Sequence, residues 1–412
     1  MKRIGVYVHV PFCAGKCAYC DFYSLAGRDK QMPDYQEAVI RHIREYASQL
    51  DGCLIDTVYF GGGTPSVLGA DRLIAIFDAL KKYGKVLVDS EVTLEANPES
   101  ASRQDLMKLR RAGFNRISLG MQSGNDKMLE TLGRRHNFAR VEEAVVDARE
   151  AGFKNVSLDL IYGLPAQSRD DWASSLAKAA ALKPDHMSCY GLKLEKGTPI
   201  YILRDSPFMP DDDTQADMYL YAVESLARYG FRQYEISNFA RRGLESAHNL
   251  KYWRCQEYIG LGPAAHSYMN SRRYSNIADL DEYIRRMGSG GSVIDSMEVI
   301  TDQEKASEYI MLGLRTTMGI AEEEYRRLDP MGMQEIVRLM EEFASHGWAA
   351  HEGDRWRLTP EGFLLSNTLI GELLEAQTRQ RMIGRRRFDP MDEMQMKMTG
   401  MAQEPAPVFK GI

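Results

Sequence analysis

The chain of 412 residues carries 58 acidic and 52 basic side chains, which gives a formal net charge of −6 at pH 7, and 44% of its residues are hydrophobic. This length allows one large domain and a smaller one, and no apolar run approaches the ~20 residues of a membrane-spanning helix. The negative balance disfavours nucleic acid as the main partner. Because no apolar signal core precedes the first strand pattern, we expect a cytoplasmic location, where the cysteines stay reduced.

From residue 3 to about residue 195, short β-branched runs alternate with longer helical patterns such as Tyr35–Gln49 and Asp105–Ala112. This alternation predicts parallel strands joined by helices. Six units are two short of a complete barrel, so we expect an α/β fold with a partial (βα)6 TIM-like barrel. In such folds the chemistry gathers at the C-terminal ends of the strands. The predicted strands are Ile4–Val10, Thr57–Phe60, Glu91–Glu95, Arg116–Leu119, Val156–Leu160 and His186–Leu192.

Three cysteines follow the first predicted strand within eight residues, at Cys13, Cys17 and Cys20. Thiolates at C-x3-C-x2-C spacing can hold three irons of a cubane cluster and leave the fourth iron without a protein ligand. An open iron can bind the amino and carboxylate groups of S-adenosylmethionine (SAM), the cofactor that pairs such binding with radical chemistry. The alternatives are a zinc site with His9 as fourth ligand, or thiols without a metal role. The other three cysteines are isolated, so no second zinc knuckle exists.

Polar or glycine-rich motifs also follow the later strands. The second strand runs into Gly61-Gly-Gly-Thr-Pro65, whose glycines allow the backbone to approach a ligand. Taken singly, each motif is more often a turn, a cap or an ion-pair partner. Their recurrence after successive strands predicts one binding site at one rim. The later motifs contain Glu95 and Asn97, then Gln122, Arg134 and Asp159.

The motifs together resemble the radical-SAM family of oxygen-independent coproporphyrinogen oxidases and their relatives. The resemblance covers residues 4 to 375 and rests on five segments in the same order: His9-Val-Pro-Phe-Cys13, Gly61-Gly-Gly-Thr-Pro65, Leu94-Glu-Ala-Asn-Pro98, Arg116-Ile-Ser-Leu-Gly-Met-Gln-Ser123 and Asp159-Leu-Ile-Tyr-Gly-Leu-Pro165. It implies that the three cysteines hold a [4Fe-4S] cluster beside a SAM site. The residues implied for that site are Tyr7, Tyr19, Gly62, Gly63, Thr64, Glu95, Gln122, Arg134, Asp159 and Lys193.

Within this family, three features separate the oxidases from the heme chaperones. The oxidases carry a further cysteine two residues after the third cluster ligand, where this chain has Phe22. They also carry a long segment ahead of the cluster motif, whereas six residues precede Tyr7 here. The third feature, His248-Asn-Leu-Lys-Tyr-Trp253, matches the HNxxYW motif of the chaperones. The resemblance therefore implies transfer of heme to acceptor proteins, with membrane-bound respiratory enzymes as candidate acceptors, and coproporphyrinogen III oxidation is the alternative function.

The HNxxYW motif also has a physical interpretation. A neutral imidazole is a good axial ligand for heme iron, so His248 is a candidate ligand, and Tyr252 and Trp253 could cover the macrocycle. A histidine beside aromatic residues is more often simply packed or hydrogen-bonded. His266 and Cys255 are candidate second ligands without a motif of their own.

A Gly/Ser-rich stretch near Ser289-Gly-Gly-Ser292 predicts a linker between a first domain, residues 1–290, and a second domain, residues 301–375. Helical patterns at Glu304–Leu314, Glu322–Arg327, Met333–His346 and from Pro360 to about Leu374 surround a predicted hairpin at Trp348–Leu358. This pattern resembles a winged helix. The domain has 15 acidic against seven basic residues. Because acidic surfaces repel phosphate, we interpret it as a packing or docking domain that does not bind nucleic acid.

The tail, residues 376–412, contains Arg379, Arg381 and Arg385-Arg-Arg387, followed by further methionines and prolines. Its composition predicts a solvated, disordered extension. The alternative is that the basic cluster makes peripheral contact with anionic lipid.

Overall fold

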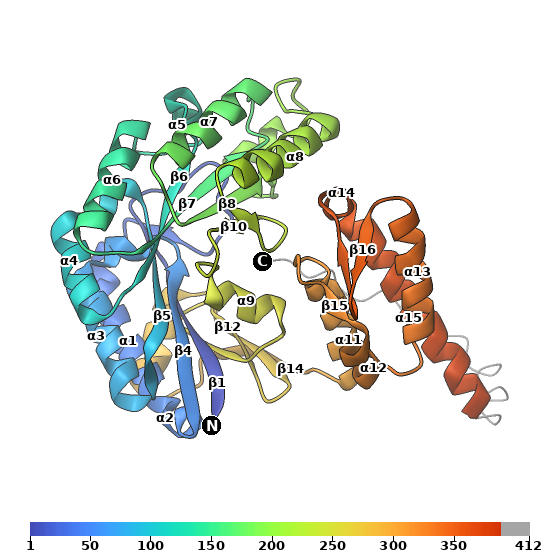
Figure 1. Cartoon of the computed structure of the whole chain (residues 1–412). Helices are drawn as coiled ribbons and strands as arrows, with labels where there is room; N and C mark the ends of the chain where they lie inside the picture. The colour runs from blue at the N-terminus through green and yellow to red at the C-terminus, as the bar shows by residue number, and fades with distance from the viewer. Residues whose placement is uncertain (389–412) are drawn as a thin grey trace.

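The computed structural model describes residues 1–388, with side chains as far as Arg381, and confirms all six predicted strands. They lie side by side and parallel, in chain order. A partial barrel results, as predicted (Figure 1). The strands are β1 (Lys2–Val10), β4 (Cys53–Gly62), β5 (Val86–Ala96), β6 (Arg116–Gln122), β7 (Asn155–Tyr162) and β8 (His186–Gly191).

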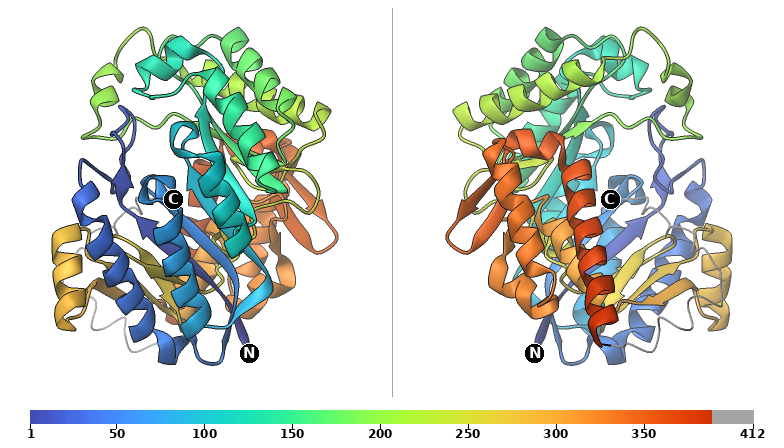
Figure 2. Two further views of the ribbon diagram at one scale, coloured as in Figure 1. Left: turned by 90° about the vertical axis from the view of Figure 1, so that its left-hand side faces the viewer. Right: turned by 90° about the vertical axis from the view of Figure 1, so that its right-hand side faces the viewer.

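Helices cover the outer face of this sheet, and the C-terminal domain lies on the opposite side (Figure 2). Successive side chains of a strand point to opposite faces, so the apolar positions of β1, such as Val6 and Val8, can pack in the core. The predicted helix Tyr35–Gln49 divides into two, α1 (Met32–Glu45) and α2 (Ala47–Leu50). The other covering helices are α3 (Ala70–Tyr83), α4 (Arg103–Ala112), α6 (Phe138–Glu150) and α7 (Arg169–Ala181).

The sheet continues beyond the six predicted strands to twelve. A short helix, α9 (Ala247–Trp253), leads into β11 (Tyr258–Leu261), which pairs with β1 in parallel. An antiparallel meander of β12 (His266–Met269), β13 (Arg272–Asn276) and β14 (Ile294–Val299) follows. At the other edge, β10 (Asn238–Ala240) and β9 (Arg232–Gln233) extend β8.

The predicted end of the first domain at residue 290 differs from the structure, because β14 still belongs to the large sheet. Gly290 adopts a left-handed conformation that ends α10 (Leu280–Ser289). The glycines after Ser289 therefore serve as a helix cap and a short turn. The first domain extends through Val299.

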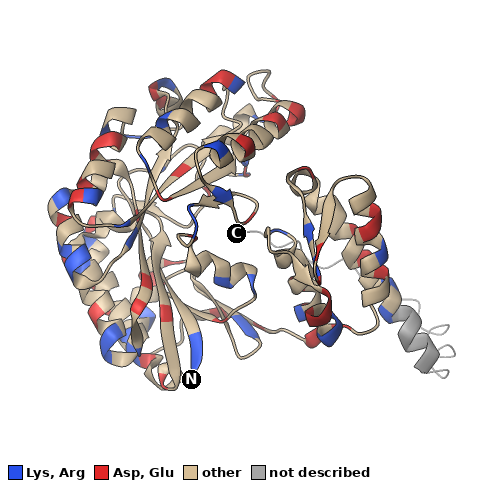
Figure 3. Ribbon diagram, in the orientation of Figure 1, with Lys and Arg blue, Asp and Glu red and all other residues tan. Residues whose placement is uncertain are grey.

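The C-terminal domain has its own hydrophobic core, to which Ile310, Tyr325 and Met340 contribute. The predicted hairpin is confirmed as β16 (Ala349–Glu352) and β17 (Arg355–Leu358), and the short β15 (Ile320–Ala321) adds a third strand. The acidic residues of the C-terminal domain are spread over several of its helices (Figure 3). The helices of this domain are α11 (Asp302–Gly313), α12 (Glu322–Leu328), α13 (Met333–Ser345), α14 (Pro360–Leu364) and α15 (Ser366–Phe388).

The predicted boundary at residue 375 also differs from the structure, because α15 continues to Phe388. Gln377 donates a hydrogen bond of 2.8 Å to the Tyr325 hydroxyl, and the Arg381 guanidinium pairs with Asp329 at 3.0 Å. These contacts fasten the start of the predicted tail to α12. Residues 389–412, which hold most of that tail, lie outside the described residues. Among residues 1–388, no helix is both long and apolar enough to cross a bilayer.

The C-terminal domain joins the barrel through backbone hydrogen bonds beside Glu235. The Ile236 amide donates to the Arg315 carbonyl at 2.9 Å, and the Thr317 amide donates to the Tyr234 carbonyl at 3.1 Å. The Glu235 side chain is fully buried there, and burial raises its pKa from 4.5 to about 7.

We expect Glu235→Gln to stabilise the protein at pH 8 and to have little effect at pH 5. A carboxyl whose pKa is raised in the folded state contributes stability at low pH that is lost as the pH rises through about 7. A pKa difference of this size is worth about 3 kcal/mol at pH 8. Chemical unfolding at both pH values measures the effect, with exposed Glu341→Gln as the control. An equal effect of Glu235→Gln at pH 5 and pH 8 would contradict the prediction.

Candidate functional site

The three predicted cluster cysteines lie at the C-terminal end of β1, where two neighbouring loops meet them. Cys13 ends the short strand β2 (Phe12–Cys13), and its Sγ lies 3.4 Å from Thr64 Oγ1, in the loop after β4. Cys17 Sγ accepts a hydrogen bond of 3.5 Å from Arg134 Nη1. All three thiols are free, and Cys17 and Cys20 are partly exposed. The site therefore offers three free sulfur donors, two of them partly exposed, beside the permanent positive charge of Arg134.

The donor set fits an iron-sulfur cluster better than a single metal ion. In the described part of the chain, no three His, Cys, Asp or Glu side chains gather around one ion position. A cubane does not require such a gathering, because each thiolate binds a different iron. Both ring nitrogens of His9 already have partners, the Tyr7 hydroxyl at 3.1 Å and the Tyr23 carbonyl at 2.8 Å. The zinc alternative, with His9 as fourth ligand, is therefore not supported.

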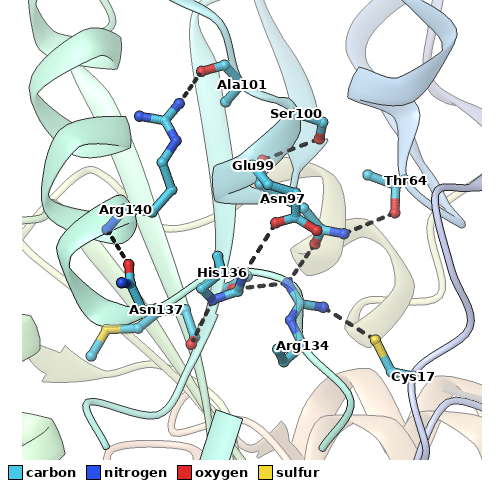
Figure 4. Close-up of polar contacts among 12 residues, drawn as sticks. Cys17, Thr64, Asn97, Glu99, Ser100, Ala101, Arg134, His136, Asn137 and Arg140 are labelled. Atoms are coloured by element: carbon cyan, nitrogen blue, oxygen red, sulfur yellow. Dashed lines mark hydrogen bonds and ion pairs between the residues drawn. The ribbon is translucent and has the colours of Figure 1, made fainter. Parts of the chain in front are cut away.

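Arg134 connects the cysteine loop to the loop after β5 (Figure 4). Besides its contact with Cys17, its Nη2 donates to Asn97 Oδ1 at 2.7 Å and to the Gly120 carbonyl at 3.0 Å. Asn97 in turn donates to Thr64 Oγ1 at 3.1 Å. The Arg134 Nε is buried and has no partner among the described residues. A buried donor without a partner is costly unless a ligand accepts from it, and a carboxylate would do so.

The glycines after β4 are required by the close approach of that loop to the cysteine segment. The Gly63 amide donates to the Val10 carbonyl at 2.8 Å, and the Thr64 amide donates to the Phe12 carbonyl at 2.8 Å. A Cβ on Gly63 would lie 2.7 Å from the Phe12 oxygen and 3.1 Å from Cys13 Sγ. Gly62 has a φ of +109°. The loop can therefore pack on the cysteine segment only with glycine at both positions.

Two predicted carboxylates lie half-buried inside the barrel. Glu95 accepts from the Tyr59 hydroxyl at 2.6 Å and from the Gly62 amide at 3.2 Å, and burial raises its pKa to about 7. Asp159 accepts from Ser118 Oγ at 3.0 Å and from Ser188 Oγ at 2.7 Å, and burial also raises its pKa. These hydrogen bonds hold both carboxylates in place at the rim.

The structure brings most of the predicted SAM residues to this rim. Gln122 ends β6 with a φ of +63°, and Tyr19 is half-buried in the cysteine loop, between Cys17 and Cys20. Lys193 differs from the others, because its side chain is exposed and pairs with Glu195. Tyr59, Ser118 and Ser188 hold the carboxylates and are not among the residues predicted from the sequence. Their signal was the alternation of polar residues with apolar ones along strands of a buried sheet.

The predicted heme residue His248 lies on α9, beside Thr57 of β4, which precedes the rim residues of that strand. The Glu91 carboxylate accepts from the backbone amides of Ala247 and His248, both at 2.9 Å, at the start of this helix. His248 Nδ1 lies 2.8 Å from Thr57 Oγ1, and Nε2 lies 2.8 Å from the Tyr252 hydroxyl. The imidazole stacks on Tyr59, and burial lowers its pKa to about 3. Both nitrogens are therefore already engaged within the protein.

The other candidate heme residues are more accessible than His248. Trp253 ends α9 with a partly exposed side chain. Cys255 is also partly exposed, and it has a φ of +51°. His266 begins β12 and is exposed. The structure does not bring these three side chains to a common point with His248.

Comparison with protein-family models matches residues 7–179 to the Radical SAM superfamily and residues 300–365 to the HemN C-terminal domain. Among solved structures, coproporphyrinogen III oxidase (HemN) from Escherichia coli superposes with a TM-score of 0.79 over 90% of each chain. The sequence identity is 22%, so this similarity establishes the fold.

Three full-length relatives are closer in sequence. The heme chaperone HemW of Mycobacterium tuberculosis strain H37Rv is 37% identical, over 90% of this chain and 95% of that protein. HemW of Bacillus subtilis is 33% identical, over 90% and 99% of the two chains. The mouse mitochondrial radical S-adenosyl methionine domain-containing protein 1 is 32% identical, over 90% and 87%. With this identity across nearly the whole length, and with the rim geometry described above, the chain belongs to the HemW family of the radical SAM superfamily.

Proposed function

We propose that the protein is a cytoplasmic heme chaperone that binds heme and passes it to an acceptor protein. The observation that carries the proposal is the similarity to heme chaperones named HemW along nearly their whole length. The HNxxYW motif at His248–Trp253, on helix α9, adds support. The expected acceptors are heme proteins, among them membrane-bound respiratory enzymes.

We further propose that Cys13, Cys17 and Cys20 hold a [4Fe-4S] cluster and that the surrounding rim binds SAM. The cluster would supply an iron position for the amino and carboxylate groups of SAM and an electron for its sulfonium. Arg134 is placed to balance the negative charge of the thiolates and to offer its free Nε to a carboxylate. The Glu95 carboxylate would accept hydrogen bonds from the ribose of SAM. It already accepts one from Tyr59 and one from Gly62, and its oxygens have lone pairs left for further donors.

The rival function is oxygen-independent coproporphyrinogen III oxidation, and the fold it requires is present. Against it, the position two residues after Cys20 holds an exposed phenylalanine, Phe22, in place of the cysteine of the oxidases. The relatives from M. tuberculosis and B. subtilis also carry the chaperone name.

We expect anaerobically reconstituted protein to bind hemin at about one equivalent per chain and to leave coproporphyrinogen III unchanged in the presence of SAM and a reductant. Hemin binding is measured by absorbance titration, and the porphyrin products are measured by chromatography. The E. coli oxidase HemN, assayed in parallel, is the positive control. Formation of protoporphyrinogen would reject the chaperone function, and so would a failure to bind hemin.

Peripheral contact between the basic tail and lipid stays a prediction. Of the predicted basic cluster, Arg381 already pairs with Asp329 at the C-terminal domain. Arg379 is exposed on α15, and Arg385-Arg-Arg387 lies where side chains are not described. We place no nucleic acid among the partners, because the described acidic groups of the C-terminal domain would repel phosphate.

A further inference from the structure

The interior of the barrel carries buried polar side chains at alternate positions of its strands. Alternate residues of a strand point to the same face, and the hydrogen bonds from Ser118 and Ser188 to Asp159 identify the inward face of β6, β7 and β8. Arg116 is two residues before Ser118 on β6, so it shares that face. In the register of the sheet, Glu95 is level with Ser118. Arg116 therefore lies inside the barrel, roughly 7 Å further from the rim along the strand.

Arg116 is a buried cation without a direct partner. The residue is 2% exposed, and in the described part of the chain its guanidinium forms no hydrogen bond or ion pair, although its Nε is fully enclosed. A buried charge is costly unless opposite charges compensate it. Burial disfavours the charged guanidinium, but the nearby Glu91 and Asp159 carboxylates raise the pKa of Arg116. The side chain therefore stays positively charged and acts electrostatically on the carboxylates around it.

The same interaction acts in return on the two carboxylates of the rim. Burial raises the pKa of Glu95 to about 7 and also raises the pKa of Asp159, whereas the positive charge of Arg116 lowers both. A unit charge roughly 7 Å away, at an effective dielectric constant of about 20, changes the pKa of a carboxyl group by more than one pH unit. Without Arg116, Glu95 would therefore be protonated at neutral pH, and the pKa of Asp159 would move in the same direction.

The charge of these carboxylates matters for the ligand expected at the rim. SAM carries a positive sulfonium and a ribose whose hydroxyl groups donate hydrogen bonds. An ionised carboxylate attracts the sulfonium and accepts from the ribose, whereas a protonated carboxyl loses the attraction and part of its accepting capacity. We infer that Arg116 is a positioning residue of the SAM site, which acts by keeping Glu95 and Asp159 negatively charged. The inference rests on the proposed function, because it presumes that SAM binds at this rim.

The other ionisable groups that face Arg116 and the two carboxylates keep one charge state around neutral pH. Burial lowers the pKa of His186 and of His248, so both imidazoles stay neutral. Arg134 stays charged, because its pKa is raised by its neighbours. Burial raises the pKa of the remaining groups, which are Tyr7, Tyr59, Tyr190, Tyr234, Tyr252 and Cys189. A protein-side pH dependence of SAM binding near pH 7 therefore reports the carboxyl groups.

The test is SAM binding by anaerobically reconstituted, full-length Arg116→Met as a function of pH. In wild type, we expect the affinity to rise with pH through about 7, as Glu95 loses its proton. In Arg116→Met, the midpoint should lie at least about one pH unit higher, so that the affinity is about fivefold below wild type at pH 7 and nearly equal to it at pH 9. Because the amino group of SAM titrates in the same range, each affinity is compared with that of wild type at the same pH.

Three further variants separate the charge of Arg116 from its packing. Arg116→Gln removes the same charge and should behave as Arg116→Met does, whereas Arg116→Lys keeps a cation and should have a midpoint close to that of wild type. Arg338→Met makes the matching substitution on the C-terminal domain, where the guanidinium pairs with Glu335, and should match wild type at every pH. If Arg116→Met lost the same factor in affinity at pH 7 and at pH 9, the role of Arg116 would be structural and the inference would be overturned.

A second measurement follows the carboxyl groups directly and needs no SAM. The infrared band of the protonated Glu95 carboxyl should disappear with a midpoint near pH 7 in wild type and at higher pH in Arg116→Met. Glu95→Gln and Glu235→Gln assign the bands, because the pKa of Glu235 is raised to a similar value. An unchanged midpoint in Arg116→Met would also overturn the inference. Wild-type protein that binds no SAM at any pH would instead refute the proposed SAM site, so the two failures are distinguishable.

Discussion

Replacing Cys13, Cys17 or Cys20 with alanine is expected to lower the iron content of anaerobically reconstituted protein from about four atoms per chain to less than about one. A cubane that already leaves one iron without a protein ligand cannot lose a second thiolate and stay bound. The three thiols lie on one loop, with Thr64 against Cys13 and Arg134 against Cys17, so no other described cysteine can replace a missing one.

Iron and sulfide analysis together with the absorbance spectrum provide the measurement. Cys53→Ala and Cys189→Ala are the matched controls, because both thiols are buried in the core away from this loop, and both variants should retain the cluster. Purification of the wild-type protein with zinc and without sulfide would contradict the prediction, as would a single cysteine variant that keeps a full cluster.

Gly63→Ala is expected to weaken SAM binding at least about tenfold and to reduce cluster retention. Its methyl group would lie 2.7 Å from the Phe12 carbonyl oxygen and 3.0 Å from that of Val10. Both obstacles are backbone atoms, so the cysteine segment itself has to move. Overpacking of this kind costs about 1–3 kcal/mol, and a displaced site loses affinity by a corresponding factor.

Gly15→Ala is the control for this substitution, because Gly15 lies between the cluster cysteines and an added Cβ meets only Arg135 at an ordinary 3.8 Å. Calorimetric titration with SAM under anaerobic conditions compares both variants with wild type. If Gly15→Ala weakened binding as much as Gly63→Ala, the effect would come from general loss of loop freedom and the steric explanation would fail.

The sequence predicted the barrel well because its strands are buried on both faces and are separated by helices of ordinary length. Such strands appear as short β-branched runs, and their order along the chain is also their order in the sheet. The edges of the sheet were harder to predict. Strands β9 and β10 have two and three residues, too few for a periodic pattern, and Gly290 was interpreted as a linker although it caps a helix.

The surroundings of His248 could not be predicted either, because its hydrogen-bond partner Thr57 is distant in the sequence. Its motif predicted a role near heme, and the imidazole lies buried between Thr57 and Tyr252. Thr57 is 191 residues away in the chain, and no local pattern indicates that the two side chains meet.

The sequence by itself determined the parallel strands, the cysteine loop and the glycine segment that follows the second strand of the barrel, because each depends on residues close together in the chain. Only the tertiary structure decided that Arg134 reaches Cys17, 117 residues away, and that Tyr59, Ser118 and Ser188 hold the carboxylates of Glu95 and Asp159. These contacts depend on the register and curvature of the sheet. Both are set by packing over the whole barrel, to which any single stretch of sequence contributes little.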